Sequence, residues 1–286
     1  MEKATIVLEG GATRGVFTAG LLDYLMEQEV AFSNVIGVSA GACNAVDYVS
    51  KQIGRTRDCM IHSEKELNYY YGIREGLKEK SLMNMDMMFD KYPNELIPFD
   101  YDTYYASDSC CEIVTTNCNN GKAEYMSETA GDGAKLLKMV RASSSMPLIC
   151  PMVEIDGIPY LDGGLADSIP IQRAMEYGNE KIVVILTQNP GYRKSRPSNS
   201  MVRLFRHAYK NRPELVHTIL RRSYVYNETI RKIQQLEQEG KIYVIRPQVP
   251  VVSRLERNTD TLMNFYHHGY QLMEKEYDSM MKYLKR

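Results

Sequence analysis

The sequence predicts a three-layer α/β/α fold: a mainly parallel sheet, helices on both of its faces, and a helical extension at the C-terminus. Two observations carry this prediction. Short runs of β-branched and apolar residues at 4–8, 35–38 and 181–186 have the pattern of strands buried on both faces. Stretches with helical spacing of apolar residues separate these runs, and connections of that length allow neighbouring strands to run parallel.

The composition is that of an ordinary globular protein. Of the 286 residues, 44% are hydrophobic and 25% are charged, which suffices for one large domain, or for one domain with an appendage. The formal net charge is only -1, so bulk charge gives no indication of nucleic-acid binding. No run approaches the roughly 18 apolar residues of a membrane-spanning helix, and the apolar run near the N-terminus is too short for a signal peptide. We therefore expect a cytoplasmic protein, with at most a peripheral contact to a membrane.

The cysteine pattern favours reduced, structural thiols over a metal site. The six cysteines, at positions 43, 59, 110, 111, 118 and 150, form no C-x-x-C pair, and no histidine stands at zinc-site spacing. No D-x-D-x-D-G loop indicates calcium. We expect neither a metal nor a cofactor.

The first part of the chain predicts two strand–turn–helix units. The strand at 4–8 enters the turn E-G-G-A-T-R-G, and the next helix places Phe17 and Leu21 on one face. The strand at 35–38 leads into a second helical pattern that continues to Val49. Two such units in succession start a parallel sheet covered by helices.

A G-x-S-x-G pattern places Ser39 at the corner between the second strand and its helix. A serine at a sharp strand-to-helix turn is typical of a nucleophile elbow, in which Gly37 and Gly41 let the chain turn tightly and leave room for a substrate. The helix that follows directs its N-terminal amides at developing negative charge. By composition the pattern arises in roughly one such chain in ten, so the serine needs partners elsewhere.

The turn E-G-G-A-T-R-G fits neither the dinucleotide pattern G-x-G-x-x-G nor a phosphate-binding G-K-[ST], so we favour an oxyanion hole. The backbone amides of Gly10, Gly11 and Ala12 would face the tetrahedral intermediate. The amide of Ala40, directly after the serine, would assist them. Arg14 either supports this loop, meets an anionic head group, or faces solvent on the first helical turn.

Residues 51–110 differ in amino-acid composition from the flanking sequence. They contain three consecutive tyrosines at 69–71 and a methionine-rich stretch at 83–89. Methionine packs adaptably, which suits a lid or a channel for variable acyl chains. A loosely patterned helix whose apolar side lies in the core is the interpretation that we favour.

The middle of the chain predicts two hairpins with a helix between them. Asn-Gly and Asp-Gly turns join strand patterns in pairs. These patterns lie at 112–116, 123–126, 153–155 and 158–161. A helix at 134–144 ends before Pro147, and Pro170 opens another helix.

The composition shifts near residue 190. A polar, basic stretch at 191–200 indicates a linker or a mobile loop. Helical patterns and one short strand follow, at 201–210, 214–239, 241–245 and from 259 to the end. We therefore expect residues 1–190 to form one domain and residues 191–286 to form a mainly helical C-terminal extension.

Residues 193–222 hold nine basic residues and one acidic residue, Glu214. Such a stretch suits contact with an anionic membrane surface. A solvated helical face is the more usual explanation.

The serine requires a base, and Asp162 is the best candidate. In triads of this fold type a histidine follows the acid, but the four histidines after Asp162 lie in the helical C-terminal third and not on a loop after a core strand. Asp162 stands at a strand end, where Gly163 and Gly164 open space. A carboxylate within hydrogen-bond range of the hydroxyl would accept its proton.

Together these blocks resemble the patatin-like phospholipases. E-G-G-A-T-R-G, G-V-S-A-G and D-G-G look like the three signature blocks of that family, and A-S-S-S-M-P at 142–147 is similar to a further block. The resemblance covers about residues 1 to 190, and the rest looks like the C-terminal extension of uncharacterised bacterial members. It implies a dyad of Ser39 and Asp162, with the first block as oxyanion hole. The chain departs from the family at Ala12, where a third glycine is usual.

The function that we expect is a serine acyl hydrolase of lipid esters, of the phospholipase A or lysophospholipase type. Ser39 would attack the ester carbonyl, and Asp162 would accept its proton and then activate water. One alternative is a lipid-binding or regulatory module without hydrolysis, with residues 193–222 as its membrane contact. Another is an acyltransferase, in which an alcohol replaces the water.

Overall fold

The computed structural model describes the chain except for residues 72–73, 75, 77, 79–80, 82 and 180. The strands are β1 (Glu2–Leu8), β2 (Phe32–Val38), β3 (Cys110–Asn117), β4 (Ala123–Met126), β5 (Val153–Ile155), β6 (Ile158–Asp162), β7 (Lys181–Ile185) and β8 (Tyr243–Ile245). The α-helices include α1 (Gly15–Glu27), α2 (Ala40–Val49), α3 (Arg55–Met60), α5 (Tyr101–Tyr105), α6 (Gly133–Ser143), α7 (Ile171–Glu176), α8 (Asn199–Ala208), α9 (Pro213–Gln238) and α10 (Thr259–Leu284). Helical segments of other types are η1 (Ala12–Arg14), η2 (Lys65–Leu67), η3 (Met87–Leu96) and η4 (Gly163–Leu165).

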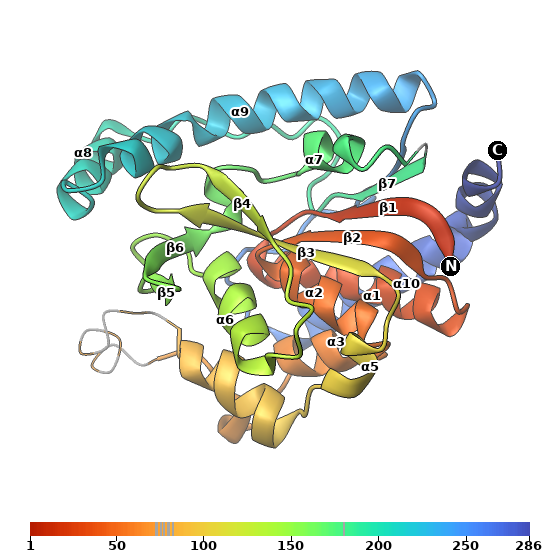
Figure 1. The fold of residues 1–286 in the computed structure, drawn as a ribbon, viewed down its shortest axis with the longest axis horizontal. Helices are drawn as coiled ribbons and strands as arrows, with labels where there is room; N and C mark the ends of the chain where they lie inside the picture. The colour runs from red at the N-terminus through yellow and green to blue at the C-terminus, as the bar shows by residue number, and fades with distance from the viewer. Residues whose placement is uncertain (72–73, 75, 77, 79–80, 82, 180) are drawn as a thin grey trace.

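A single sheet forms the middle layer, and helices cover both of its faces (Figure 1). The strand order is β5-β6-β3-β2-β1-β7-β8, with β4 paired to β3 beside this path. Five neighbouring strands in this order run parallel: β3, β2, β1, β7 and β8. The remaining strands pair antiparallel, β4 and β6 with β3, and β5 with β6. The three-layer prediction is therefore confirmed, and the hairpins form the antiparallel end of the sheet.

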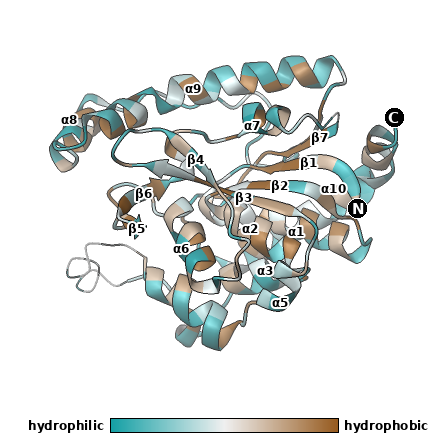
Figure 2. Cartoon of the chain, in the orientation of Figure 1, coloured by the Kyte–Doolittle hydropathy of each residue, from teal (hydrophilic) through white to brown (hydrophobic). Residues whose placement is uncertain are grey.

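Alternating side chains of the central strands build two cores. Ile6 and Leu8 of β1 join the cluster that contains α1, α2 and α10, whereas Val7 joins the cluster with α7 and α9. Both kinds of position are fully buried, which explains why these strands are continuous apolar runs. Figure 2 shows that the central strands are largely hydrophobic, whereas hydrophilic and hydrophobic residues alternate along α9.

The register of the sheet brings the sequence motifs to one place. Val38, the last residue of β2, pairs with Val114 of β3, so Ser39 follows at the level of Thr115. On the other side of β3, Thr115 pairs with Asp162. Ser39 and Asp162 therefore flank β3 at the same height.

Residues after 190 pack directly onto the rest of the fold. Strand β8 extends the sheet by pairing with β7, and α10 lies along α1. The contact is close, because a Cβ at Gly269 would lie 2.1 Å from the carbonyl oxygen of Phe17. The stretch at 191–200 is no loose linker, since Lys194 exchanges backbone hydrogen bonds with the Asn227 side chain of α9. The boundary at residue 190 stays a prediction.

In the part of the chain that the structure describes, no helix is long and apolar enough to cross a bilayer.

Candidate active site

Ser39 lies on a strained corner between β2 and α2. Its φ of 56° and ψ of -123° place a residue other than glycine in the left-handed half of backbone space. Such a conformation costs about 1–3 kcal/mol and persists only where the surroundings enforce it. Here Ser143 Oγ accepts from the Ser39 amide at 2.8 Å, and the Ser39 carbonyl accepts from Ala42 N at 2.8 Å. The corner has the shape of a nucleophile elbow.

The glycines around the serine serve close backbone packing. A Cβ at Gly37 would lie 2.4 Å from the Gly41 carbonyl oxygen, and one at Gly41 would lie 2.3 Å from that of Leu8. These two glycines let α2 pack against the strand ends, and their expected role of leaving room for a substrate stays a prediction. Gly10 is the residue that faces the serine, since its Cβ would lie 2.8 Å from Ser39 Cβ.

Ser39 and Asp162, which are 123 positions apart, are in direct contact. Ser39 Oγ donates to Asp162 Oδ2 at 2.8 Å, and both side chains are buried. The other carboxylate oxygen, Oδ1, accepts from Gly164 N at 2.7 Å. Gly163 lets the chain pass close to β3, because a Cβ there would lie 2.0 Å from the Val114 carbonyl oxygen. The aspartate is thus fixed with one oxygen aimed at the serine hydroxyl.

The block A-S-S-S-M-P supports both residues of this pair, which sequence reasoning did not foresee. Ser143 is fully buried and, besides accepting from Ser39 N, donates to the Val114 carbonyl at 2.6 Å. The carbonyl of Ser145 accepts from Asp162 N at 2.8 Å. The available signal was the run of serines directly after a helix and before a proline.

Ser143→Ala is expected to lower the free energy of unfolding by about 1–3 kcal/mol, because it leaves the buried Ser39 amide without an acceptor. Urea denaturation followed by circular dichroism measures this change. Ser144→Ala is the matched control: among the described residues, the Ser144 hydroxyl has one hydrogen-bond partner, Cys43 Sγ at 3.7 Å, so the effect is expected within about 0.5 kcal/mol. Equal stability of the Ser143 variant and the wild type would contradict the supporting role.

The glycine-rich turn lies against the serine and is firmly held. Gly10 O accepts from Thr187 Oγ1 at 2.9 Å, and Glu9 Oε2 accepts from Thr187 N at 2.7 Å. In the described chain, the amides of Gly10 and Gly11 donate to no protein acceptor. Ala12 has a φ of 51°, the left-handed conformation that a glycine adopts without strain.

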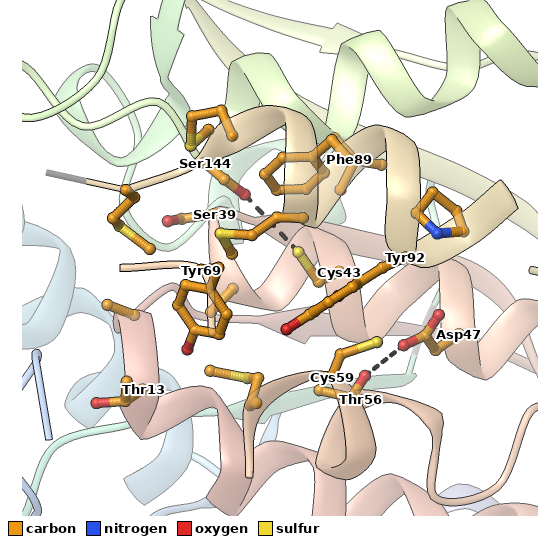
Figure 3. Close-up of a pocket in the computed structure, with 18 of the residues that line it drawn as sticks. Thr13, Ser39, Cys43, Asp47, Thr56, Cys59, Tyr69, Phe89, Tyr92 and Ser144 are labelled. Carbon is orange, nitrogen blue, oxygen red and sulfur yellow. Dashed lines mark hydrogen bonds between the residues drawn. The ribbon is translucent and has the colours of Figure 1, made fainter. Parts of the chain in front are cut away.

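Ser39 opens into a largely apolar cavity (Figure 3). Tyr69, Phe89 and Tyr92 line it together with Cys43, which lies one helical turn after the serine. Met83, Met85 and Met88 of the methionine-rich stretch also line it. Met83, Met85 and Phe89 are at the same time part of the apolar core. The stretch therefore contributes to the core, as favoured, and also lines a cavity, while its role as a lid or acyl channel stays a prediction. Within residues 51–110, positions 72–73, 75, 77, 79–80 and 82 lie outside the described residues.

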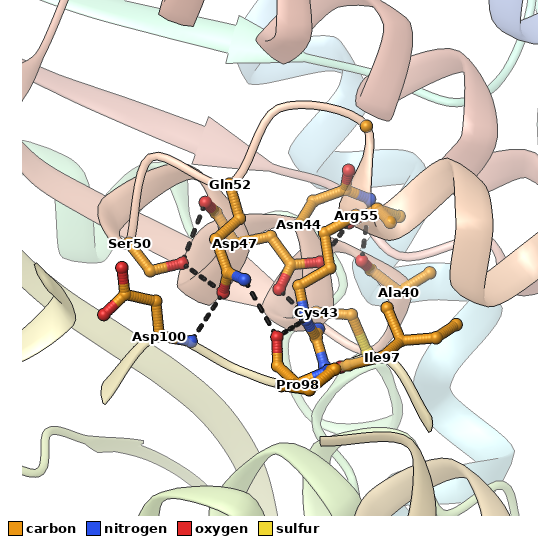
Figure 4. A network of polar contacts seen from close by, with 12 residues as sticks. Ala40, Cys43, Asn44, Asp47, Ser50, Gln52, Arg55, Ile97, Pro98 and Asp100 are labelled. Atoms are coloured by element: carbon orange, nitrogen blue, oxygen red, sulfur yellow. Dashed lines mark hydrogen bonds and ion pairs between the residues drawn. The ribbon is translucent and has the colours of Figure 1, made fainter. Parts of the chain in front are cut away.

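The thiol and the charges in this cavity are not reactive groups. Burial raises the pKa of Cys43 to about 12, so the thiol stays neutral. Asp47 Oδ1 pairs with Arg55 Nη1 at 2.7 Å, and Asp47 Oδ2 accepts from Thr56 Oγ1 at 2.5 Å. Arg55 also donates to the carbonyls of Ile97 and Pro98 (Figure 4). This network links α2, α3 and the chain near Pro98, and it presents no unpaired charge to an apolar ligand.

A second, polar cavity meets Ser39 from the other side. It is lined by Gly10, Gly11 and Asp162, and also by Arg14. Arg14 donates from Nε to the Val252 carbonyl at 2.8 Å and is half-buried, so it does not simply face solvent. Within the described residues, no histidine lines either cavity.

The chain matches the family model described as patatin-like phospholipase over residues 6–175, more than half of its length. It belongs to the patatin-like phospholipase family. A second model, a domain of unknown function, matches this patatin-like chain over residues 212–285. The second match covers the whole of α9 and α10.

Two curated relatives are similar to this chain. The uncharacterized protein YjjU of Escherichia coli is 29% identical over 197 residues, which are 65% of this chain and 52% of that protein. The probable lipid hydrolase 463L of invertebrate iridescent virus 6 is 22% identical over 192 residues, 62% of this chain and 65% of that protein. The chain thus spans between about half and two thirds of the length of these relatives.

The crystal structure of VipD from Legionella pneumophila has a similar fold. Its TM-score to the patatin-like chain is 0.50 at 12% identity, covering 98% of this chain and 67% of that one. At that identity the likeness bears on the fold alone.

Proposed function

We propose that the protein is a carboxylic ester hydrolase that cleaves lipid esters with a serine–aspartate dyad. The observation that carries the proposal is the 2.8 Å hydrogen bond from Ser39 Oγ to Asp162 Oδ2, at the mouth of an apolar cavity. Membership of the patatin-like phospholipase family and the similarity to a probable lipid hydrolase support the lipid substrate. A phospholipase A or lysophospholipase reaction is the specific activity that we propose.

In the first half of the reaction, Ser39 Oγ attacks the ester carbonyl carbon while its proton passes to Asp162 Oδ2. The carbonyl oxygen becomes an oxyanion, which the amides of Gly10, Gly11 and Ala12 stabilise, with that of Ala40 at the start of α2. When the intermediate collapses, the alcohol leaves with the proton held by Asp162. The acyl group stays on Ser39 as an ester.

In the second half, water replaces the alcohol. Asp162 takes a proton from the water as it attacks the acyl-enzyme, and that proton returns to Ser39 Oγ when the fatty acid leaves. The acyl chain occupies the apolar cavity throughout, where adaptable methionine side chains accept different lengths. If an alcohol takes the place of water, the same steps transfer the acyl group.

We propose a peripheral membrane contact through residues 193–222, with α8 at its centre. Helix α8 has no buried residue and exposes Met201 and Leu204, while Arg203 and Arg206 lie on the same short helix. Apolar side chains beside basic ones suit the surface of an anionic bilayer.

Labelling with a fluorophosphonate tests the proposed function without knowledge of the natural substrate. The wild type is expected to acquire one covalent phosphonyl group on Ser39, located by peptide mass spectrometry, and Ser39→Ala is expected to acquire none. Labelling that is equal in both proteins, or absent in both, would contradict the proposal and favour a non-hydrolytic lipid-binding module.

Ala12→Gly is expected to leave kcat for a soluble ester within about threefold of wild type. The free energy of unfolding should also change little. Glycine relieves about 1 kcal/mol of left-handed strain in the folded protein, but it raises the conformational entropy of the unfolded chain by a similar amount in free energy. Ala12→Val is the matched variant, because a β-branched residue does not tolerate this φ, and it is expected to lose both activity and stability. A gain above about tenfold in the glycine variant would mean that the methyl group narrows the oxyanion hole.

A further inference from the structure

The polar cavity beside Ser39 gathers basic side chains from distant parts of the chain. Arg14, Lys194, Arg222 and Arg254 line it, against the two carboxylates of Glu9 and Asp162. They come from η1, the coil after β7, helix α9 and the coil before α10. With every group ionised, four positive charges face two negative ones.

No carboxylate neutralises these four cations. In the described part of the chain, none of them forms an ion pair. Arg222 Nε donates to the Gly164 carbonyl at 2.6 Å, and Lys194 Nζ lies 3.7 Å from the centre of the Tyr226 ring. The side chain of Arg254 donates to no described acceptor. Lys194 also donates to Ser168 Oγ at 3.2 Å.

Each oxygen of the two carboxylates already accepts a hydrogen bond from another group. Glu9 accepts from Thr187 N and, at 2.9 Å, from the Tyr226 hydroxyl, so its oxygens hold the turn and α9. Asp162 accepts from Ser39 and from Gly164. The excess positive charge of the cavity therefore stays available to a ligand.

Desolvation and neighbouring cations both act against the charged forms of these side chains. Burial, with Arg222 nearby, lowers the pKa of Lys194 well below its usual value. Burial also lowers the pKa of Arg222, which Asp162 raises and Arg254 lowers. A bound anion would relieve both the desolvation and the repulsion. Lys194 and Arg222 are half-buried, and partly desolvated cations without an ion-pair partner are costly, so their gathering at one place points to a ligand of opposite charge.

The cavity is joined to the apolar one at the serine. Ser39, Ala12, Met146 and Arg254 line both cavities. The turn itself holds Arg254 in place, since Thr13 Oγ1 donates to the Ser253 carbonyl at 2.8 Å. An ester at Ser39 therefore has its acyl chain on one side and its alcohol part among the cations on the other.

We infer that this cavity binds the phosphate of an anionic glycerophospholipid whose acyl ester lies at Ser39. The inference rests on the proposed function and narrows its substrate class. The planar guanidinium group of arginine matches the spacing of two phosphate oxygens. A phosphate with a charge of -1 or -2 would balance the excess of positive charge among the side chains that line the cavity. A neutral lipid supplies no phosphate, and a zwitterionic head group adds to the phosphate an ammonium group that the cations of the cavity repel.

Soluble short-chain lipids test the inference without a membrane surface. Dihexanoyl phosphatidylglycerol and dihexanoyl phosphatidylcholine are compared below their micelle concentrations, so that bilayer contact through α8 plays no part. The wild type is expected to hydrolyse the anionic lipid with a kcat/KM about tenfold or more above that for the zwitterionic one. Lys194→Met and Arg254→Gln are each expected to reduce this ratio several-fold, mainly through KM of the anionic lipid.

Arg231→Met is the matched control, because Arg231 is an exposed cation of α9 that lines neither cavity, and it is expected to keep the ratio. A ratio near one in the wild type would overturn the inference. So would a ratio that Lys194→Met and Arg254→Gln leave unchanged.

Equilibrium binding to Ser39→Ala separates this inference from the proposed function, because it needs no turnover. Calorimetry is expected to give about tenfold tighter binding of the anionic lipid than of the zwitterionic one. Lys194→Met in the same background is expected to remove the difference. Inorganic phosphate provides the remaining arm: if it binds as tightly as the anionic lipid, the cavity is a site for free phosphate, and the assignment to a lipid head group is wrong.

Discussion

Ser39→Ala and Asp162→Asn are each expected to lower kcat/KM for a medium-chain p-nitrophenyl ester by about 10⁴-fold or more. The first change removes the attacking oxygen. The second keeps the shape of the side chain, so an amide oxygen still accepts from Gly164 N, but the amide nitrogen then faces Ser39 Oγ and takes up no proton. Initial rates of p-nitrophenol release, in buffer with a chelator and no added calcium, measure both losses.

The double variant is expected to be no slower than either single one, because the two residues act as a unit. Asp167→Asn is the matched control: it is the same substitution on a carboxylate of the same segment, bonded to the Tyr125 hydroxyl at 2.8 Å and outside both cavities at Ser39. Its rate is expected within about threefold of wild type. If Asp162→Asn retained more than about 1% of the activity, another group would have to be the base.

Gly10→Ala is expected to lower kcat by about 10²–10³-fold, with a loss of about 1–3 kcal/mol in the free energy of unfolding. The added Cβ would lie 2.7 Å from the Val38 carbonyl oxygen and 2.8 Å from Ser39 Cβ, so the turn must shift. A shift breaks the bond between Gly10 O and Thr187 Oγ1 and moves the amides away from the oxyanion. Rates with the soluble ester and thermal melts measure the two effects separately.

Gly240→Ala provides the comparison for this variant. Gly240 has a φ of 65° after α9, and a Cβ there would meet no atom within 4 Å. We expect it to cost about 1 kcal/mol of stability through backbone strain, with kcat unchanged. If Gly10→Ala behaved in the same way, the turn would have no catalytic role.

The sequence allowed prediction of the layers of the fold and of the pair Ser39 and Asp162, because both depend on local patterns. Buried strands are continuous apolar runs, and each member of the pair stands at a strand end beside glycines. The contact between them depends on β3, whose register with β2 and β6 sets them at one height. No local signal carries such a register.

The polar cavity was beyond the reach of sequence reasoning for a different reason. The basic stretch at 193–222 was interpreted as a membrane-facing or solvated surface, and nothing in it distinguishes Lys194 and Arg222 from its other cations. In the folded protein these two side chains point into the polar cavity, where Arg222 Nε donates to the Gly164 carbonyl and Lys194 Nζ donates to Ser168 Oγ. Arg254 stands in a segment without any motif, and hydrogen bonds from Thr13 of η1 to the carbonyls of Ser253 and Arg254 hold that segment at the site.

The position of helix α9 bears on how lipid selectivity could change among related proteins. It carries Arg222 and Tyr226, which contact Gly164 and Glu9, yet it belongs to a part of the chain that shares none of the signature blocks. The proposed dyad and the groups that we assign to the head group are thus encoded in separate stretches. If both assignments hold, substitutions at 194, 222 and 254 would change lipid selectivity without altering the proposed dyad.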